Sequence, residues 1–197
     1  MLVRWREAES RDFSLKIFVC FFLTAVGGLI LDKFHFELPE SVEPVASALI
    51  IGGLIFIGVE AWLKGRLLNP RITWTVVIVV AGAQLLAAVF PGASRSGSTI
   101  ILAMAIGVTR VAATEFSFLV GIPTLLAAGA YKIFQALRDG ATEDWGMLAL
   151  GAIVAAAVSF VAVKWLLRFV QSHTFVSFGI YRILLGLVLL WMLWPRS

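Results

Sequence analysis

Cysteine, histidine and charged residues are all scarce in this sequence of 197 residues. Its single cysteine, Cys20, cannot form an internal disulfide, and the two histidines and one cysteine make no Cys/His cluster for a metal ion. Only 14% of the residues are charged, whereas soluble domains average about 25%. This excludes a soluble protein. No basic face or recognition motif is visible either, which excludes nucleic acid as a partner.

What the chain has instead is apolar residues, which make up 60% of it. Several runs reach the length of about 20 residues that a membrane-spanning helix needs, and open strands cannot span a bilayer. The predicted fold class is therefore all-α: a polytopic membrane helix bundle that forms a single transmembrane domain over residues 1–197. The five predicted full spans are 13–31, 45–62, 112–134, 145–167 and 175–194. The first span lacks a small-residue cleavage site, so we expect it to be retained rather than removed as a signal peptide.

The segment 72–109 fits neither one span nor two, because it is too long for one and too short for two with a turn. Basic residues gather before the first span, in the link 63–71, at Arg110 and around 164–168, while the links 32–44 and 135–144 are acidic. The positive-inside rule puts the basic links in the cytoplasm, and this works only if segment 72–109 begins and ends on the same side. We therefore predict a re-entrant helix-turn-helix hairpin, broken at Pro91-Gly92.

The turn of this hairpin, "FPGASRSGST" at 90–99, holds the only charged residue between Ile72 and Thr109, which is Arg95. Irregular backbone at membrane depth is tolerated only next to protein or a wet cavity, and an ionisable residue there indicates a functional site. A guanidinium fork, glycines that let the backbone approach a ligand, and a helix that opens near Thr99 predict a phosphate site. Since the cavity lies in the membrane, we expect the phosphate to belong to a lipid.

The candidate residues fall into two groups. We assign Arg95 as the clamp on the phosphate, Ser94 as a donor to it or a nucleophile, and Thr99 as a further hydroxyl at the helix start. The predicted substrate-binding residues are Gly92, Ser96, Gly97, Ser98 and Gln84. For Gln84 a polar contact between helices explains the residue equally well. A structural explanation for the whole turn also exists, since small residues pack helices together and Arg95 could neutralise a nearby carboxylate.

The stretch 91–99, "PGASRSGST", resembles the signature of the bacterial undecaprenyl-diphosphate phosphatases, the bacitracin-resistance (BacA/UppP) family. The stretches "ALIIGGLIFIGVEAW" at 48–62, "GAQLLAAVFPG" at 82–92, "EFSFLVGIPTLLAAGAYK" at 115–132 and "FGIYRILLG" at 178–186 agree in order and spacing. The resemblance covers nearly the whole chain.

The resemblance implies a hydrolase that removes the terminal phosphate of undecaprenyl diphosphate, the lipid carrier of cell-wall synthesis. It implies two inverted repeats, each with a re-entrant hairpin, so this chain would show a partial inverted repeat. It also implies a divalent cation, magnesium or calcium, although no ligand cluster for a metal is visible here and the metal ligands are unknown. The implied location is the bacterial inner membrane, with the site open to the outer face.

One motif of the family has no counterpart in this sequence. It lies near the family's N-terminus, is rich in glutamate and reads E-x-x-x-E-F-x-P-x-S-S-x-G-H. We therefore expect the chain to lack the family's first re-entrant hairpin. The partners that we expect are a further copy of the chain in a homo-oligomer, or a partner chain that supplies the missing hairpin. Two alternatives to the phosphatase follow: an inactive truncated member of the family, and a lipid-phosphate flippase or transporter, since broken helices at mid-membrane also serve transporters.

Two further features match the family but carry less specific predictions. Glu115, in the stretch "EFSF", either supports Arg95 or pairs with Arg110 at the interface. Tyr181 and Arg182, in the stretch "YR", are interpreted as structural anchors at the membrane interface.

Overall fold

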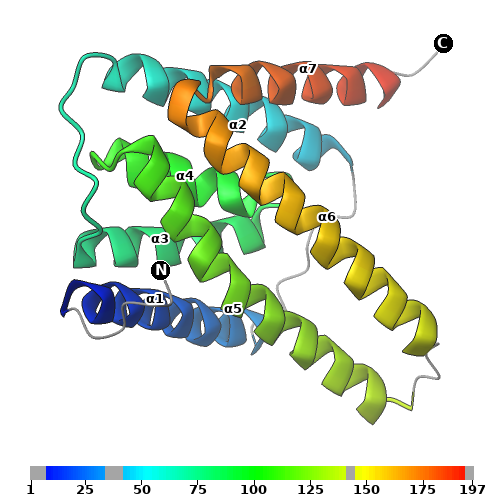
Figure 1. Cartoon of the computed structure of the whole chain (residues 1–197). Helices are drawn as coiled ribbons and strands as arrows, with labels where there is room; N and C mark the ends of the chain where they lie inside the picture. The colour runs from blue at the N-terminus through cyan, green and yellow to red at the C-terminus, as the bar shows by residue number, and fades with distance from the viewer. Residues whose placement is uncertain (1–7, 34–41, 141–144, 194–197) are drawn as a thin grey trace.

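The computed structural model describes residues 8–33, 42–140 and 145–193 of the chain. These residues form seven α-helices and no sheet, apart from one isolated bridge between extended residues (Figure 1). The helices are α1 (Ala8–Lys33), α2 (Val42–Leu63), α3 (Trp74–Val89), α4 (Arg95–Ala105), α5 (Arg110–Arg138), α6 (Trp145–Ser172) and α7 (Val176–Leu193).

Five of these helices, α1, α2, α5, α6 and α7, are long and apolar enough to cross a membrane. They coincide with the five predicted spans to within a few residues at each end. The predicted all-α bundle is confirmed, and the chain is a multi-pass membrane protein. The predicted topology also uses the charged residues before residue 8 and in the links 34–41 and 141–144, which lie outside the described residues.

The segment between the second and third full spans forms the predicted hairpin. The two helices of this hairpin, α3 with 16 residues and α4 with 11, pack against one another. At the base of the hairpin the chain pairs with itself: Asn69 N–H donates to Gly107 O at 2.8 Å, and Thr109 N–H donates to Asn69 O at 3.1 Å. The hairpin therefore begins and ends on the same side of the bundle, as the charge pattern required.

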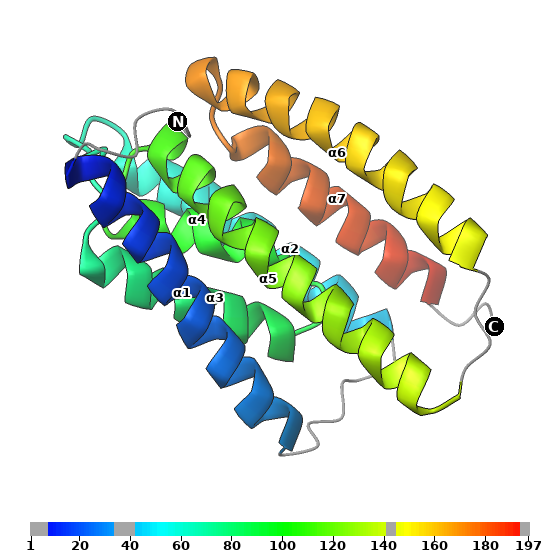
Figure 2. The same ribbon diagram turned by 60° about the horizontal axis from the view of Figure 1, so that its bottom comes forward.

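Small residues let α2 and α7 lie backbone to backbone (Figures 1 and 2). A methyl group added at Gly53 would lie 2.6 Å from Gly179 O, and one added at Gly179 would lie 2.8 Å from Gly53 O. Close approach at small residues is how membrane helices gain packing energy where lipid removes the usual hydrophobic driving force. This contact gives the hairpin a rigid neighbour, since α2 also packs against α4.

The core surrounds the hairpin. Val77 and Val80 of α3, Met104 of α4 and Phe116 of α5 are fully buried among α1, α3, α4 and the first half of α5. By contrast, Val170 is the only buried residue of α6. The outward-facing apolar surface of α6 is typical of a helix in contact with lipid. The base of the hairpin is thus held in the best-packed part of the protein, while residues 91–96 at its tip are half-buried.

Candidate active site

The hairpin turn occupies residues 90–94 and delivers the chain into the N-terminus of α4. Ser94 is the N-cap residue of α4, and its Oγ accepts a hydrogen bond from Gly97 N–H at 3.2 Å. Its backbone is strained: with φ at 62°, Ser94 is the only residue other than glycine with a positive φ in the described part of the chain. Such strain is stored mainly at functional sites, and the surrounding structure must hold it in place.

Arg95 is the first residue of α4 and is half-buried. Its Nη1 lies 3.5 Å from Gly121 O on α5, which is a long hydrogen bond. A methyl group at Gly121 would lie 2.9 Å from Arg95 Nη2, so the guanidinium rests in a space that the glycine leaves open. No ion pair joins Arg95 to a carboxylate among the described residues. The structural alternative, neutralisation of a neighbouring acid, therefore has no support in this part of the chain.

The start of α4 adds further donors beside this guanidinium. In any α-helix the first N–H groups have no intrahelical acceptor, and here those of Arg95 and Ser96 open the helix. The Ser96 side chain forms no hydrogen bond to another described residue. The helix dipole adds partial positive charge at the same end. A guanidinium, free N–H groups and a hydroxyl at a helix N-terminus are the elements of an anion site, and phosphate fits it best.

Two glycines of the motif, Gly92 in the turn and Gly97 in α4, make close contacts. Gly92 has φ at 88°, and a methyl group there would lie 2.7 Å from Val45 O of α2. At Gly97 the added group would lie 3.0 Å from Ser94 Oγ and 3.1 Å from Phe56 Cζ. Both glycines thus let the turn approach α2 closely. Their predicted role in substrate binding stays a prediction.

The remaining hydroxyls of the motif face the protein. Thr99 is buried, and its Oγ1 lies 3.0 Å from Arg95 O, 2.9 Å from Ser96 O and 2.5 Å from Ser117 Oγ. Ser98 Oγ donates to Ala93 O at 3.1 Å. In this structure both side chains brace the turn from within, and their predicted contact with substrate stays a prediction.

Gln84 lies on α3 with its side chain against α1. Its Nε2 donates to Thr24 Oγ1 at 2.9 Å, and the side chain is 4% exposed. This is the polar contact between helices that the sequence offered as the alternative for Gln84.

Sequence reasoning missed the role of Arg182, which was interpreted as an interfacial anchor. The structure corrects this, because Arg182 is 8% exposed and its Nη2 donates to Gly92 O at 2.9 Å. The available signal was the one used for Arg95, since Arg182 is the only charged residue of the predicted span 175–194. Two guanidinium groups therefore lie beside the hairpin turn.

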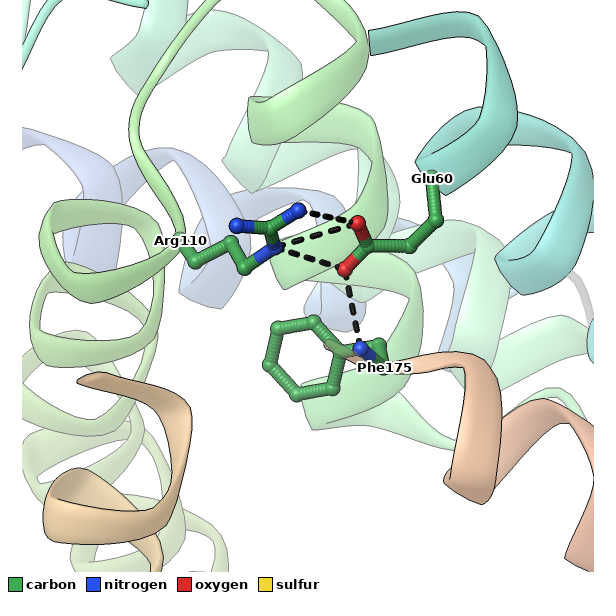
Figure 3. Close-up of polar contacts among 3 residues, drawn as sticks. All are labelled: Glu60, Arg110 and Phe175. Atoms are coloured by element: carbon green, nitrogen blue, oxygen red, sulfur yellow. Dashed lines mark hydrogen bonds and ion pairs between the residues drawn. The ribbon is translucent and has the colours of Figure 1, made fainter. Parts of the chain in front are cut away.

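A second charged cluster lies at the base of the hairpin (Figure 3). Arg110 Nε donates to Glu60 Oε1 at 2.8 Å and to Oε2 at 3.1 Å, and Phe175 N–H donates to Oε1 at 2.9 Å. Glu60 on α2 is thus the ion-pair partner of Arg110, and the predicted pairing of Glu115 with Arg110 is wrong. The cluster ties α2, α5 and the start of α7 together. It was not predicted, although Glu60 is the only charged residue of the span 45–62.

The described residues do not fit a divalent cation. No group of three or more His, Cys, Asp or Glu side chains gathers anywhere in them. Around the turn the side chains are guanidinium and hydroxyl groups, whereas Mg²⁺ and Ca²⁺ prefer carboxylate and carbonyl oxygens.

Comparison with known proteins shows the family. The family model described as bacitracin resistance protein BacA matches residues 2–188. A protein of Rhizobium etli named undecaprenyl-diphosphatase is 50% identical over 195 residues, which cover 98% of this chain and 74% of that protein. Proteins of the same name from Rhizobium johnstonii and Xylella fastidiosa are 49% and 45% identical, over 98% and 92% of this chain and 74% and 71% of their own lengths. The chain belongs to the bacitracin resistance protein BacA family.

Proposed function

We propose that this protein hydrolyses undecaprenyl diphosphate to undecaprenyl phosphate and inorganic phosphate, with the hairpin turn as the phosphate-binding part of its active site. The observation that carries the proposal is Arg95. Its guanidinium lies at the N-terminus of α4 with no carboxylate partner among the described residues. The similar proteins, all named undecaprenyl-diphosphatase, supply the substrate class. The reaction recycles the lipid carrier of peptidoglycan synthesis, which links it to bacitracin resistance.

The reaction breaks one phosphoanhydride bond. The oxygen of a water molecule attacks the terminal phosphorus, the bond to the bridging oxygen breaks, and that oxygen leaves with the lipid phosphate. The proton that the water releases passes to a phosphate oxygen or to solvent water. Phosphoryl transfer depends mainly on positioning and on neutralising the charge that spreads over the phosphoryl oxygens. Arg95 is suited to this because its planar fork can donate two parallel hydrogen bonds to a phosphate.

Ser94 is best suited to be a donor. Its Oγ already accepts from Gly97 N–H, which leaves its own proton free to bond a phosphate oxygen. A serine nucleophile would need a base within hydrogen-bond reach, and the described residues place no His, Asp or Glu side chain in hydrogen-bond contact with Ser94. The N–H groups of Arg95 and Ser96 complete the set of donors around the anion.

The test is phosphate release from undecaprenyl diphosphate by the purified protein in detergent. Release above that of a variant without the Arg95 guanidinium supports the phosphatase. Movement of the lipid between vesicle leaflets without release of phosphate would instead identify a flippase. If neither occurs in protein that has inserted normally, the chain is inactive on its own and the proposal fails.

The finer predictions belong to the same proposal. We expect the protein in the bacterial inner membrane with the turn open to the outer face, which cysteine labelling from either side of the membrane can test. The divalent cation that the resemblance implies is tested by phosphate release before and after chelation. Assembly with a second copy or a partner chain is tested by the mass of the protein in detergent.

A further inference from the structure

The side chain of Arg182 is directed at the backbone of the hairpin turn. A single nitrogen, Nη2, donates to Gly92 O at 2.9 Å and lies 3.5 Å from Ala93 O and 3.4 Å from Ala48 O. Gly92 and Ala93 are the two residues immediately before Ser94. Arg182 on α7 therefore fixes the peptide groups that set the direction in which the chain enters Ser94.

The guanidinium of Arg182 lies in a notch in α2. A methyl group at Gly52 would lie 2.5 Å from Arg182 Nη2, 3.1 Å from Cζ and 3.2 Å from Nε. Any side chain at position 52 would push the guanidinium away from the turn. The adjacent contact between Gly53 and Gly179 holds α2 and α7 together, so the notch cannot widen easily.

Holding Arg182 in this place has a cost for the protein. Its Nε is buried without a hydrogen-bond partner, and no described carboxylate forms an ion pair with it. A buried cation without a counter-charge, and a buried N–H without an acceptor, both destabilise the folded state. Purely structural packing at this position would be better met by an apolar residue of similar size. The strained φ of Ser94 also needs neighbours that hold it, and the bonds from Arg182 do so.

We propose that Arg182, seated on Gly52, is a positioning residue: it holds the turn in the conformation that presents Ser94 and Arg95 to the diphosphate. This inference rests on the proposed function of the turn. It assigns Arg182 a task inside the protein rather than at the membrane interface.

The test compares Gly52→Ala with Gly58→Ala. Both substitutions lie in α2 and both favour a helix, but an added methyl at Gly58 meets nothing within 4 Å. A small displacement of a catalytic group can lower the reaction rate by up to about 100-fold. We therefore expect Gly52→Ala to lower kcat about tenfold and to leave the melting temperature unchanged. Gly58→Ala should keep the parent kcat. Equal kcat values for the two variants would overturn the proposal.

A second variant separates positioning from direct contact with the substrate. If Arg182 acts through the turn that presents Arg95, then Arg182→Gln should lower kcat strongly in the parent protein but less than about twofold when Arg95 is already lysine. Full additivity of the two changes would contradict the proposal, because it would make Arg182 an independent ligand. Arg182→Lys, which keeps the charge, should recover part of the lost kcat.

Binding of inorganic diphosphate keeps this inference apart from the proposed function. The rise in melting temperature that diphosphate causes in detergent measures its binding at the turn and requires no turnover. We expect the shift in the parent protein and in Gly58→Ala, and its loss in Gly52→Ala and Arg182→Gln. That pattern in a protein without phosphatase activity would remove the proposed reaction and leave the role of Arg182 standing. A shift that is equal in all four proteins would remove the role of Arg182.

Discussion

Two charged clusters inside the bundle are built in opposite ways. At the base of the hairpin, Arg110 faces the buried carboxylate of Glu60, which also accepts from Phe175 N–H (Figure 3). At the tip of the hairpin, Arg95 and Arg182 lie beside the turn, and the described residues offer neither of them a carboxylate. The first cluster is electrically balanced, whereas the second carries two positive charges.

This difference in charge indicates a structural role for the cluster at the base and a ligand-binding role for the cluster at the tip. A balanced pair is complete without a ligand, and breaking it leaves one buried charge alone. An unbalanced cluster in an apolar protein gains from a bound anion, and intramembrane charges of this kind mark substrate sites. We therefore expect substitutions at the base to change stability with little effect on the chemistry, and substitutions at the tip to do the reverse.

The largest effect should come from Arg95→Ala. Removing a donor that acts on charge developing in the transition state costs about 100- to 1000-fold in kcat, and Arg95 supplies two N–H groups. Since no ion pair with a described residue is broken, the melting temperature in detergent should stay within about 2 °C of the parent value. The measurements are phosphate release and thermal unfolding of the same preparation. Unchanged turnover would show that the clamp lies elsewhere.

Glu60→Gln should show the opposite behaviour. It leaves the Arg110 cation without its counter-charge, and breaking a buried pair in this way costs about 3 kcal/mol. For a chain of this size that corresponds to a melting temperature lower by about 6 to 12 °C. Phosphate release per folded molecule should change less than about threefold, because the pair lies at the other end of the hairpin.

A control for the pair is the double variant Glu60→Leu with Arg110→Met. Replacing both partners by apolar residues should recover most of the lost stability. If the double variant is as unstable as Glu60→Gln, the pair is more than a balanced structural contact.

A smaller effect is expected for Gly121→Ala on α5. The added methyl would lie 2.9 Å from Arg95 Nη2, at the end of a flexible side chain that can move aside. The guanidinium would shift without strain elsewhere, so kcat should fall about tenfold while the melting temperature holds. Gly129→Ala on the same helix meets nothing within 4 Å and should behave as the parent. Similar kcat values for both variants would show that the space beside Gly121 does not position Arg95.

The smallest effect should come from Ser117→Ala, which removes one partner of the buried Thr99 hydroxyl. Thr99 keeps Arg95 O and Ser96 O as acceptors, so the loss should be about 1 kcal/mol of stability. A fall in kcat beyond about threefold, larger than a simple loss of bracing implies, would indicate that Thr99 reaches the substrate.

The sequence predicted the fold well because the lipid environment leaves few choices. Apolar length defined α1, α2, α5, α6 and α7, and the length of 72–109 together with its charged flanks defined the hairpin. The site was predicted in part. Arg95 stood out as a lone charge in an apolar segment. The start of the outgoing helix was predicted wrongly: it was expected near Thr99, whereas α4 begins at Arg95 with Ser94 as its N-cap residue, which leaves Thr99 inside the helix.

The rest of the site depends on contacts between distant segments, which local patterns do not contain. Arg182 lies 90 residues from Gly92, and Arg110 lies 50 residues from Glu60. Both arginines were given nearby or interfacial roles, because the sequence shows where a charge lies along the chain but not which helix it meets. A stricter use of one rule would have helped: Glu60 and Arg182, like Arg95, are single charges in apolar segments.

The pairing of Asn69 with Gly107 and Thr109 bears on how the protein is made. Because the chain enters and leaves the hairpin at one clasp, the insertion machinery never has to carry Arg95 from one face of the bilayer to the other. Arg95 has to enter the bilayer only to the depth of the hairpin tip. A closed loop is thus a route by which a membrane protein delivers a strongly hydrated side chain to its interior while avoiding the full crossing.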